Sequence, residues 1–104
     1  MGGRDEVYHA IAHPVRRALL VALSNGEKQA SDLAAPFDMS FAAVSQHLKI
    51  LREADLVRER REGRNRIYAC NAAALFDVVA WARHFQPYWN EKLDDLERYL
   101  DKSK

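Results

Sequence analysis

Halfway along the chain, the hydrophobic pattern changes from a helical period to a strand period. Up to about Ala54 the apolar residues recur at helical spacing, whereas residues 57–62 and 65–70 are compatible with two β-strands. Between these segments stands Gly63-Arg64, a natural hairpin turn. Because 104 residues suffice for one domain and not for two, we expect residues 1–104 to form a single domain that is mainly α with a small β-hairpin.

Turn residues mark two helices in the first quarter of the chain. Val7, Tyr8 and Ile11 indicate a short first helix. Pro14 suits the first position of a second helix, where a missing N–H costs little, and Ser24-Asn25-Gly26 ends that helix.

Residues 31–54 are expected to form a helix-turn-helix. Ser31 can cap a short third helix that Pro36 limits, and Ser40 can cap a fourth helix from Phe41 to about Ala54. Two short helices joined by a tight turn and followed by a basic hairpin are typical of the winged helix-turn-helix fold. The hairpin at about residues 57–70 is the expected wing.

The fourth helix has one face suited to a protein core and another suited to DNA. At 100° per residue, Val44, Leu48 and Leu51 fall in a narrow arc that must face the core. The outward side is small and polar, so the helix can enter a major groove, where glutamine can bond an adenine edge in two places. The candidate DNA-binding residues of this helix and its cap are Ser40, Ala42, Ala43, Ser45, Gln46, His47 and Lys49.

Positive charge is concentrated in residues 40–70. This segment holds seven basic and four acidic side chains, although the whole chain carries a net charge of only +1. A local basic stripe is what a phosphate backbone would meet, and a solvated hairpin of mixed charge is the alternative interpretation. The candidate wing residues are Arg60, Arg61, Arg64 and Arg66. We expect Glu59 and Glu62 to form cross-strand pairs with some of these arginines.

The end of the chain predicts a long helix with too many large apolar side chains for a small monomer to cover. Asn71 can cap it, it is expected over about residues 73–101, and Pro87 should kink or divide it near Gln86. Packing on the chain's own first helix is one solution, and burial against a second copy is the one we favour. We therefore expect a homodimer formed through the N- and C-terminal helices, with an interface that includes Val7, Ile11, Phe85, Trp89, Leu93 and Leu96.

Two segments resemble the arsenical-resistance-repressor (ArsR)-like family of bacterial transcription regulators. They are AIAHPVRRALLVAL and SFAAVSQHLKILREADLVRERREGRNRIYA, which together cover residues 9–70. The family's Val-Ser-x-His-Leu run lies here at Val44 to Leu48, and its Gly-Arg wing tip at Gly63-Arg64. The ending WARHFQPYWNEKLDDLERYL is similar to the last helix of a metal-independent branch. The resemblance implies a homodimeric repressor that binds a palindromic double-stranded DNA operator and leaves it when an effector, here unknown, binds.

Three departures from the family pattern bear on structure and sensing. Asp55 stands where the family usually has glycine after the recognition helix, and a left-handed cap still suits aspartate. The cysteines of the family's arsenic site are replaced by Gln29 to Ser31, and its zinc site is reduced to Asp77 and His84. Because zinc needs about four N, O or S ligands, we expect no metal and no cofactor.

Two further functions stay open, and two are disfavoured. A metal- or redox-responsive sensor would hold its switch in the C-terminal helices, and a sensing role of Cys70 or of the His9 and His13 pair stays open. A protein-interaction module would use the aromatic C-terminal helix without touching DNA. An enzyme is not expected, because no nucleophile with a base and an oxyanion site is recognisable. Residues 1–10 lack the apolar run of a signal peptide, and no apolar run approaches the roughly 20 residues of a membrane span. We therefore expect a cytoplasmic protein that does not engage a membrane.

Overall fold

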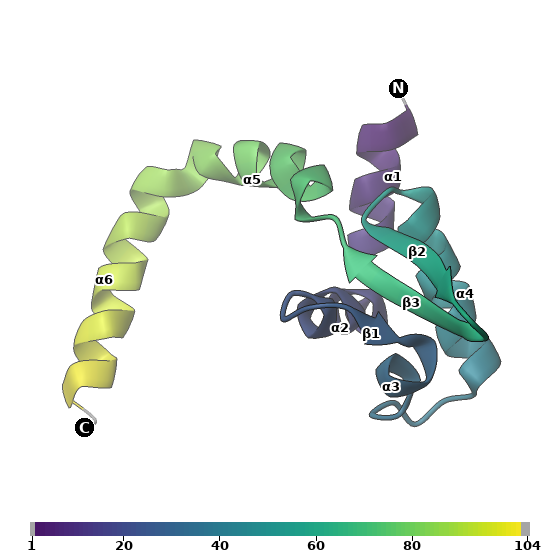
Figure 1. The fold of residues 1–104 in the computed structure, drawn as a ribbon. Helices are drawn as coiled ribbons and strands as arrows, with labels where there is room; N and C mark the ends of the chain where they lie inside the picture. Colours follow the sequence, from purple (N-terminus) through teal and green to yellow (C-terminus); the bar gives the residue numbers. More distant parts are fainter. Residues whose placement is uncertain (1, 103–104) are drawn as a thin grey trace.

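The computed structural model describes the backbone of residues 2–102 and the side chains of residues 5–101. Most elements are helical, and a three-stranded antiparallel sheet lies among the first four helices (Figure 1). The mainly α architecture with a hairpin wing is thus confirmed. The elements are α1 (Gly2–Ile11), α2 (Pro14–Leu23), β1 (Lys28–Gln29), α3 (Ala30–Ala34), α4 (Phe41–Glu53), β2 (Val57–Glu62), β3 (Asn65–Cys70), η1 (Ala72–Leu75), α5 (Phe76–Ala82), η2 (Arg83–Phe85) and α6 (Gln86–Lys102).

Local capping explains where two of the helices begin. Pro14 is the first residue of α2, and the His13 side chain accepts a hydrogen bond from the Val15 N–H. At α4, the Ser40 hydroxyl accepts from the Ala43 N–H at 3.1 Å. The expectation that Ser31 caps α3 is wrong: this helix begins at Ala30, directly after β1, without a side-chain cap.

The recognition helix α4 ends in a left-handed cap that turns the chain into the sheet. Asp55 has φ of 61°, as expected for the position where the family carries glycine. The Leu56 N–H donates to the Leu51 carbonyl at 2.9 Å, and the Asp55 N–H donates to the Arg52 carbonyl at 2.9 Å. Leu51 and Leu56 are fully buried, so the cap packs against the core through these two side chains.

The sheet has the strand order β1-β3-β2, and its register sorts the wing side chains onto two faces. Glu59 pairs with Tyr68 and Arg61 with Arg66 on one face, whereas Arg60 pairs with Ile67 on the other. Strand β1 was not expected from the sequence. Its two residues pair with Tyr68 and Ile67 of β3, and two residues are too few to carry a periodic signal.

The core lies between α1, α2, α3, α4 and the sheet. Fully buried leucines come from four separate segments, and each stabilises the fold by roughly 1.5–3 kcal/mol relative to an exposed side chain. They are Leu19, Leu33, Leu48, Leu51 and Leu56. Val44, Leu48 and Leu51 are all buried, which confirms the predicted inner face of α4.

The C-terminal segment differs from the single capped helix that the sequence predicts. The Asn71 side chain does not cap a helix but donates to the Asp55 carbonyl at 2.8 Å. The chain then passes through η1, α5 and η2 before α6 begins at Gln86, so the division near Pro87 is confirmed. We call residues 83–102 the arm and the preceding residues the body. The arm projects from the body (Figure 1), every residue from 83 to 101 is exposed, and the radius of gyration is 16.6 Å, against about 13 Å for a compact chain of this length.

Candidate nucleic-acid interface

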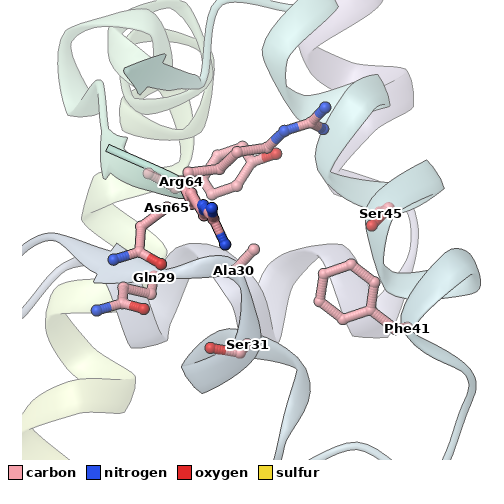
Figure 2. A pocket seen from close by; sticks show the side chains of 9 residues that line it. Gln29, Ala30, Ser31, Phe41, Ser45, Arg64 and Asn65 are labelled. Atoms are coloured by element: carbon pink, nitrogen blue, oxygen red, sulfur yellow. The ribbon is translucent and has the colours of Figure 1, made fainter. Parts of the chain in front are cut away.

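The start of α4, the α3 segment and the hairpin enclose one hollow of about 260 Å³. In Figure 2, Phe41 and Ser45 from α4 and Arg64 and Asn65 from the hairpin lie around it. Recognition helix and wing therefore present a common concave surface. Its lining residues are Gln29, Ala30, Ser31, Phe41, Ser45, Arg64, Asn65, Arg66 and Tyr68. Of the predicted DNA-binding residues it brings together Ser45, Arg64 and Arg66, and it adds Gln29, Ser31 and Asn65, which no helical or basic pattern in the sequence marks.

The outward face of α4 carries small and polar side chains, as predicted. Ala42, Gln46 and Lys49 are exposed, and Ala43 and Ser45 are half-buried. Among the residues that the structure describes, Ser45, Gln46 and Lys49 have no side-chain partner, so their polar groups are available to a ligand. Ser40 is exposed, and because its oxygen already accepts from Ala43, its hydroxyl proton remains free to donate.

His47 lies on a different side of α4 from these residues. Its Nδ1 is 3.2 Å from Nη1 of Arg16 on α2, and its ring centroid is 4.5 Å from that of His13. The half-buried ring is thus held against α2 and not directed at the hollow. We therefore leave His47 out of the DNA-contacting set that the sequence predicted.

The wing arginines are not equivalent. Arg60 binds Glu27 at 2.8 Å and Glu62 at 2.6 Å, and the hydrogen bond that it donates to Glu27, then the one that it donates to Glu62, holds the pKa of Arg60 above its usual range. Arg61 and Arg64 have no partner among the described side chains. The charges free to meet phosphate are therefore at the hairpin tip and on the face that Arg61 shares with Arg66.

Glu59 ties the wing to the recognition helix. Its Oε2 accepts from Arg52 Nη1 of α4 and from the Tyr68 hydroxyl of β3, both at 2.8 Å. Burial opposes the charge, but the Tyr68 hydrogen bond, Arg52 and Arg66 outweigh it, so the pKa of Glu59 lies below its usual value. The expected cross-strand pairs are present only in part: Arg66 acts electrostatically on Glu59 from the neighbouring strand, but the ion pair of Glu59 is with Arg52 of α4, and Glu62 binds Arg60 of its own strand.

The side chains expected at a dimer interface divide between core and surface. Val7 is only 6% exposed and belongs to the core of the single chain, so it has little surface to offer a partner. Ile11 is half-buried. The four arm residues remain uncovered, with exposed fractions of 48% for Phe85, 38% for Trp89, 54% for Leu93 and 50% for Leu96.

The residues considered for sensing include a half-buried thiol and two histidines that form hydrogen bonds within the chain. Burial raises the pKa of the half-buried Cys70 thiol, which lowers its thiolate fraction. His13 Nδ1 is used as a helix cap, and His84 Nδ1 lies 2.9 Å from the Trp81 carbonyl. Within the described residues, no three His, Cys, Asp or Glu side chains form a group able to hold a metal ion. Within the same residues, no helix has the length and apolar content needed to cross a membrane.

Comparisons with known proteins show the family of the chain. The sequence model of the family described as "Bacterial regulatory protein, arsR family" matches residues 13–59. The transcriptional repressor SdpR of Bacillus subtilis is 35% identical over 81 residues, which are 78% of this chain and 90% of that protein. The HTH-type transcriptional regulator Rv2034 of Mycobacterium tuberculosis is 32% identical over 97 residues, which are 93% of this chain and 88% of that protein.

A solved structure shows the same fold. The crystal structure of an ArsR family transcriptional regulator superposes with a TM-score of 0.75 at 32% identity, covering 86% of this chain and 92% of that one. Fold, hollow and sequence similarity lead to one assignment, in which the winged helix-turn-helix serves DNA binding and not catalysis. The chain belongs to the ArsR family of bacterial regulatory proteins and is a DNA-binding transcriptional regulator.

Proposed function

We propose that the protein is a cytoplasmic repressor that binds a palindromic operator in double-stranded DNA as a homodimer. The observation that carries this proposal is the shared hollow, where Ser45 of the recognition helix and the unpaired Arg64 of the wing face the same surface. One duplex can meet both when a helix lies in the major groove and a wing reaches the adjoining backbone. The similar protein SdpR is named a repressor, which supports the direction of control.

Within this proposal, α4 reads the bases. Ala42 and Ala43 let the helix approach the floor of the groove, and the Gln46 amide matches the donor and acceptor of an adenine edge. Lys49 reaches a base or a phosphate from the same face. The Ser40 hydroxyl and the first N–H groups of α4 favour a phosphate.

The wing contributes positive charge to DNA binding and does not distinguish one base from another. Arg61, Arg64 and Arg66 contact phosphates, or a narrow minor groove, on the side of the sheet that faces α4. Arg60 acts indirectly, because its guanidinium is engaged by Glu27 and Glu62. It holds β2 against the residue that precedes β1.

The arm supplies the dimer contact. Phe85, Trp89, Leu93 and Leu96 recur at spacings of four, four and three residues, which places them on one stripe that is about 17 Å long. Burial of this stripe against its copy, assisted by Ile11, would hold two recognition helices at the roughly 34 Å spacing of successive major grooves. An effector would act by shifting this arm.

Selection of a duplex from a random pool, followed by binding measurements, tests the base-reading role. Gln46→Ala should weaken binding to the selected duplex by roughly 1–3 kcal/mol and relax the preference at one position in each half-site. Gln86→Ala, the same change on the arm, is the matched control and should leave the preference unchanged. Equal losses on selected and random DNA would show that Gln46 does not read a base.

A further inference from the structure

Arg16 is a buried cation that the DNA-binding surface does not use. Its side chain is on α2, it is 6% exposed, and Nε donates to the Ala10 carbonyl at 2.6 Å. Nη2 donates to the His9 carbonyl at 3.2 Å. These carbonyls belong to the last turn of α1, where the helix has unsatisfied acceptors and its negative end. Arg16 therefore caps the C-terminal end of α1. No carboxylate among the described residues forms an ion pair with it.

The remaining guanidinium nitrogen joins this junction to the recognition helix. Nη1 of Arg16 is 3.2 Å from Nδ1 of His47 on α4. A guanidinium can only donate hydrogen bonds, so Nδ1 of His47 must accept, and the ring proton must be on Nε2. His47 is consequently neutral in this arrangement. His47 directly follows Ser45 and Gln46 in the sequence, so a shift of His47 also shifts the face of α4 that reads DNA.

A second histidine packs beside His47. His13 lies 4.5 Å from His47 between ring centroids, and its Nδ1 accepts from the Val15 N–H at 3.1 Å. The charged and titratable groups that face His47 from the packed elements are Arg16 and His13, and no described carboxylate offsets a proton there.

We propose that the Arg16–His47 contact positions the recognition helix and that protonation of His47 breaks it, so that operator binding is lost on acidification. This inference rests on the proposed function. Arg16 and His47 are positioning residues in it and do not touch DNA. Operator binding thereby becomes sensitive to acid through the junction of α1, α2 and α4.

The direction of the pH dependence follows from proton linkage. Burial, then the charges of His13 and Arg16, lowers the pKa of His47 from its ordinary value of 6.5. With the contact broken, the ring is free to bind a proton at its ordinary pKa. Above pH 6.5 both arrangements are neutral and the contact is fully present, whereas below it the broken arrangement takes up the proton and gains population.

The test compares two duplexes over a range of pH at constant ionic strength. The full-length protein is titrated by fluorescence anisotropy, from about pH 8 to about pH 5.5, into a duplex selected from a random pool at about pH 8 and into a random duplex. Affinity for the selected duplex should fall by up to about tenfold per pH unit below 6.5. Affinity for random DNA should rise, because protonated histidines add positive charge.

The variant His47→Gln keeps an acceptor for Arg16 and cannot be protonated. Each variant is compared with its own affinity at about pH 8, and the fall at low pH should disappear in His47→Gln. His9→Gln removes an exposed histidine on α1 and should retain the fall. Parallel pH profiles for wild type and His47→Gln, or a flat wild-type profile, would overturn the proposal.

Ring titration by NMR in the wild-type protein keeps the test decisive if His47→Gln does not fold. The proposal requires the His47 resonance to move over the pH range in which specific affinity is lost. Loss of affinity that follows only the resonances of His9 or His84 would refute it. Absence of sequence preference at about pH 8 would instead count against the proposed function.

Discussion

The body and the arm carry the same kind of apolar stripe, but the stripe of the body is buried and that of the arm is exposed. On α4, Val44, Leu48 and Leu51 are at most 1% exposed, whereas on α6 Trp89 and Leu93 are 38% and 54% exposed. Periodicity therefore predicted an apolar stripe on both helices and did not reveal what each stripe would pack against. Most helical stability in proteins comes from packing of an apolar face. The apolar face of α4 is already packed within the chain, whereas that of α6 would gain stability from a partner.

The largest expected effect comes from charging the arm. Trp89→Asp with Leu93→Asp would bury unpaired carboxylates in the proposed interface, at a cost of several kcal/mol. Sedimentation should show a monomer, and operator binding should be lost although no DNA-facing residue has changed. The body should still unfold cooperatively, because its core contains neither side chain.

The control changes the opposite side of the same helix. Glu91→Gln with Asp94→Asn removes two exposed charges away from the stripe and should leave the dimer intact. A folded monomer of the Trp89 and Leu93 variant that binds a palindromic duplex with wild-type strength would contradict the dimer proposal.

Truncating one leucine in each region separates internal from intermolecular packing. Leu51→Ala should lower the free energy of unfolding by roughly 2–5 kcal/mol at any protein concentration, because Leu51 is fully buried within one chain. Leu96→Ala should reduce the unfolding temperature mainly at concentrations where wild type is dimeric. Thermal melts at two concentrations make this comparison, and identical concentration dependence for both variants would count against it.

Two arginines of the body should differ in how they affect the salt dependence of DNA binding. Arg64→Ala should reduce the slope of log affinity against log salt by about one, because an unpaired cation would release a counterion. Arg60→Ala should change the slope less, since Glu27 and Glu62 already neutralise it. Similar slope changes would mean that the ion pairs of Arg60 open on DNA.

The smallest expected effect tests the left-handed cap of α4. With φ of 61°, position 55 costs an alanine about 1 kcal/mol that glycine does not incur. Asp55→Gly should therefore be more stable than Asp55→Ala by about that amount in chemical denaturation. Equal stability of the two variants would show that the left-handed backbone does not penalise a Cβ at this position.

Local signals predicted much of the DNA-reading element. The Ser40 cap, the buried face of α4, the hairpin around Gly63 and the left-handed Asp55 all depend on residues a few positions apart. The candidate DNA interface could be predicted only where its residues lie on such an element. Ser45 and Gln46 were identifiable because a helix assigns each residue to a face.

Long-range packing decided the rest. The partners Arg60 and Glu27 are 33 residues apart, and Arg16 and His47 are 31 residues apart, so no local period relates them. Only the sheet register and the crossing of α2 with α4 place their atoms within hydrogen-bond distance. In the same way, the sequence determined that Val7 and Trp89 are apolar members of helices, but tertiary packing decided that one lies in the core and the other on the arm's surface, because burial requires a neighbouring element and not a pattern.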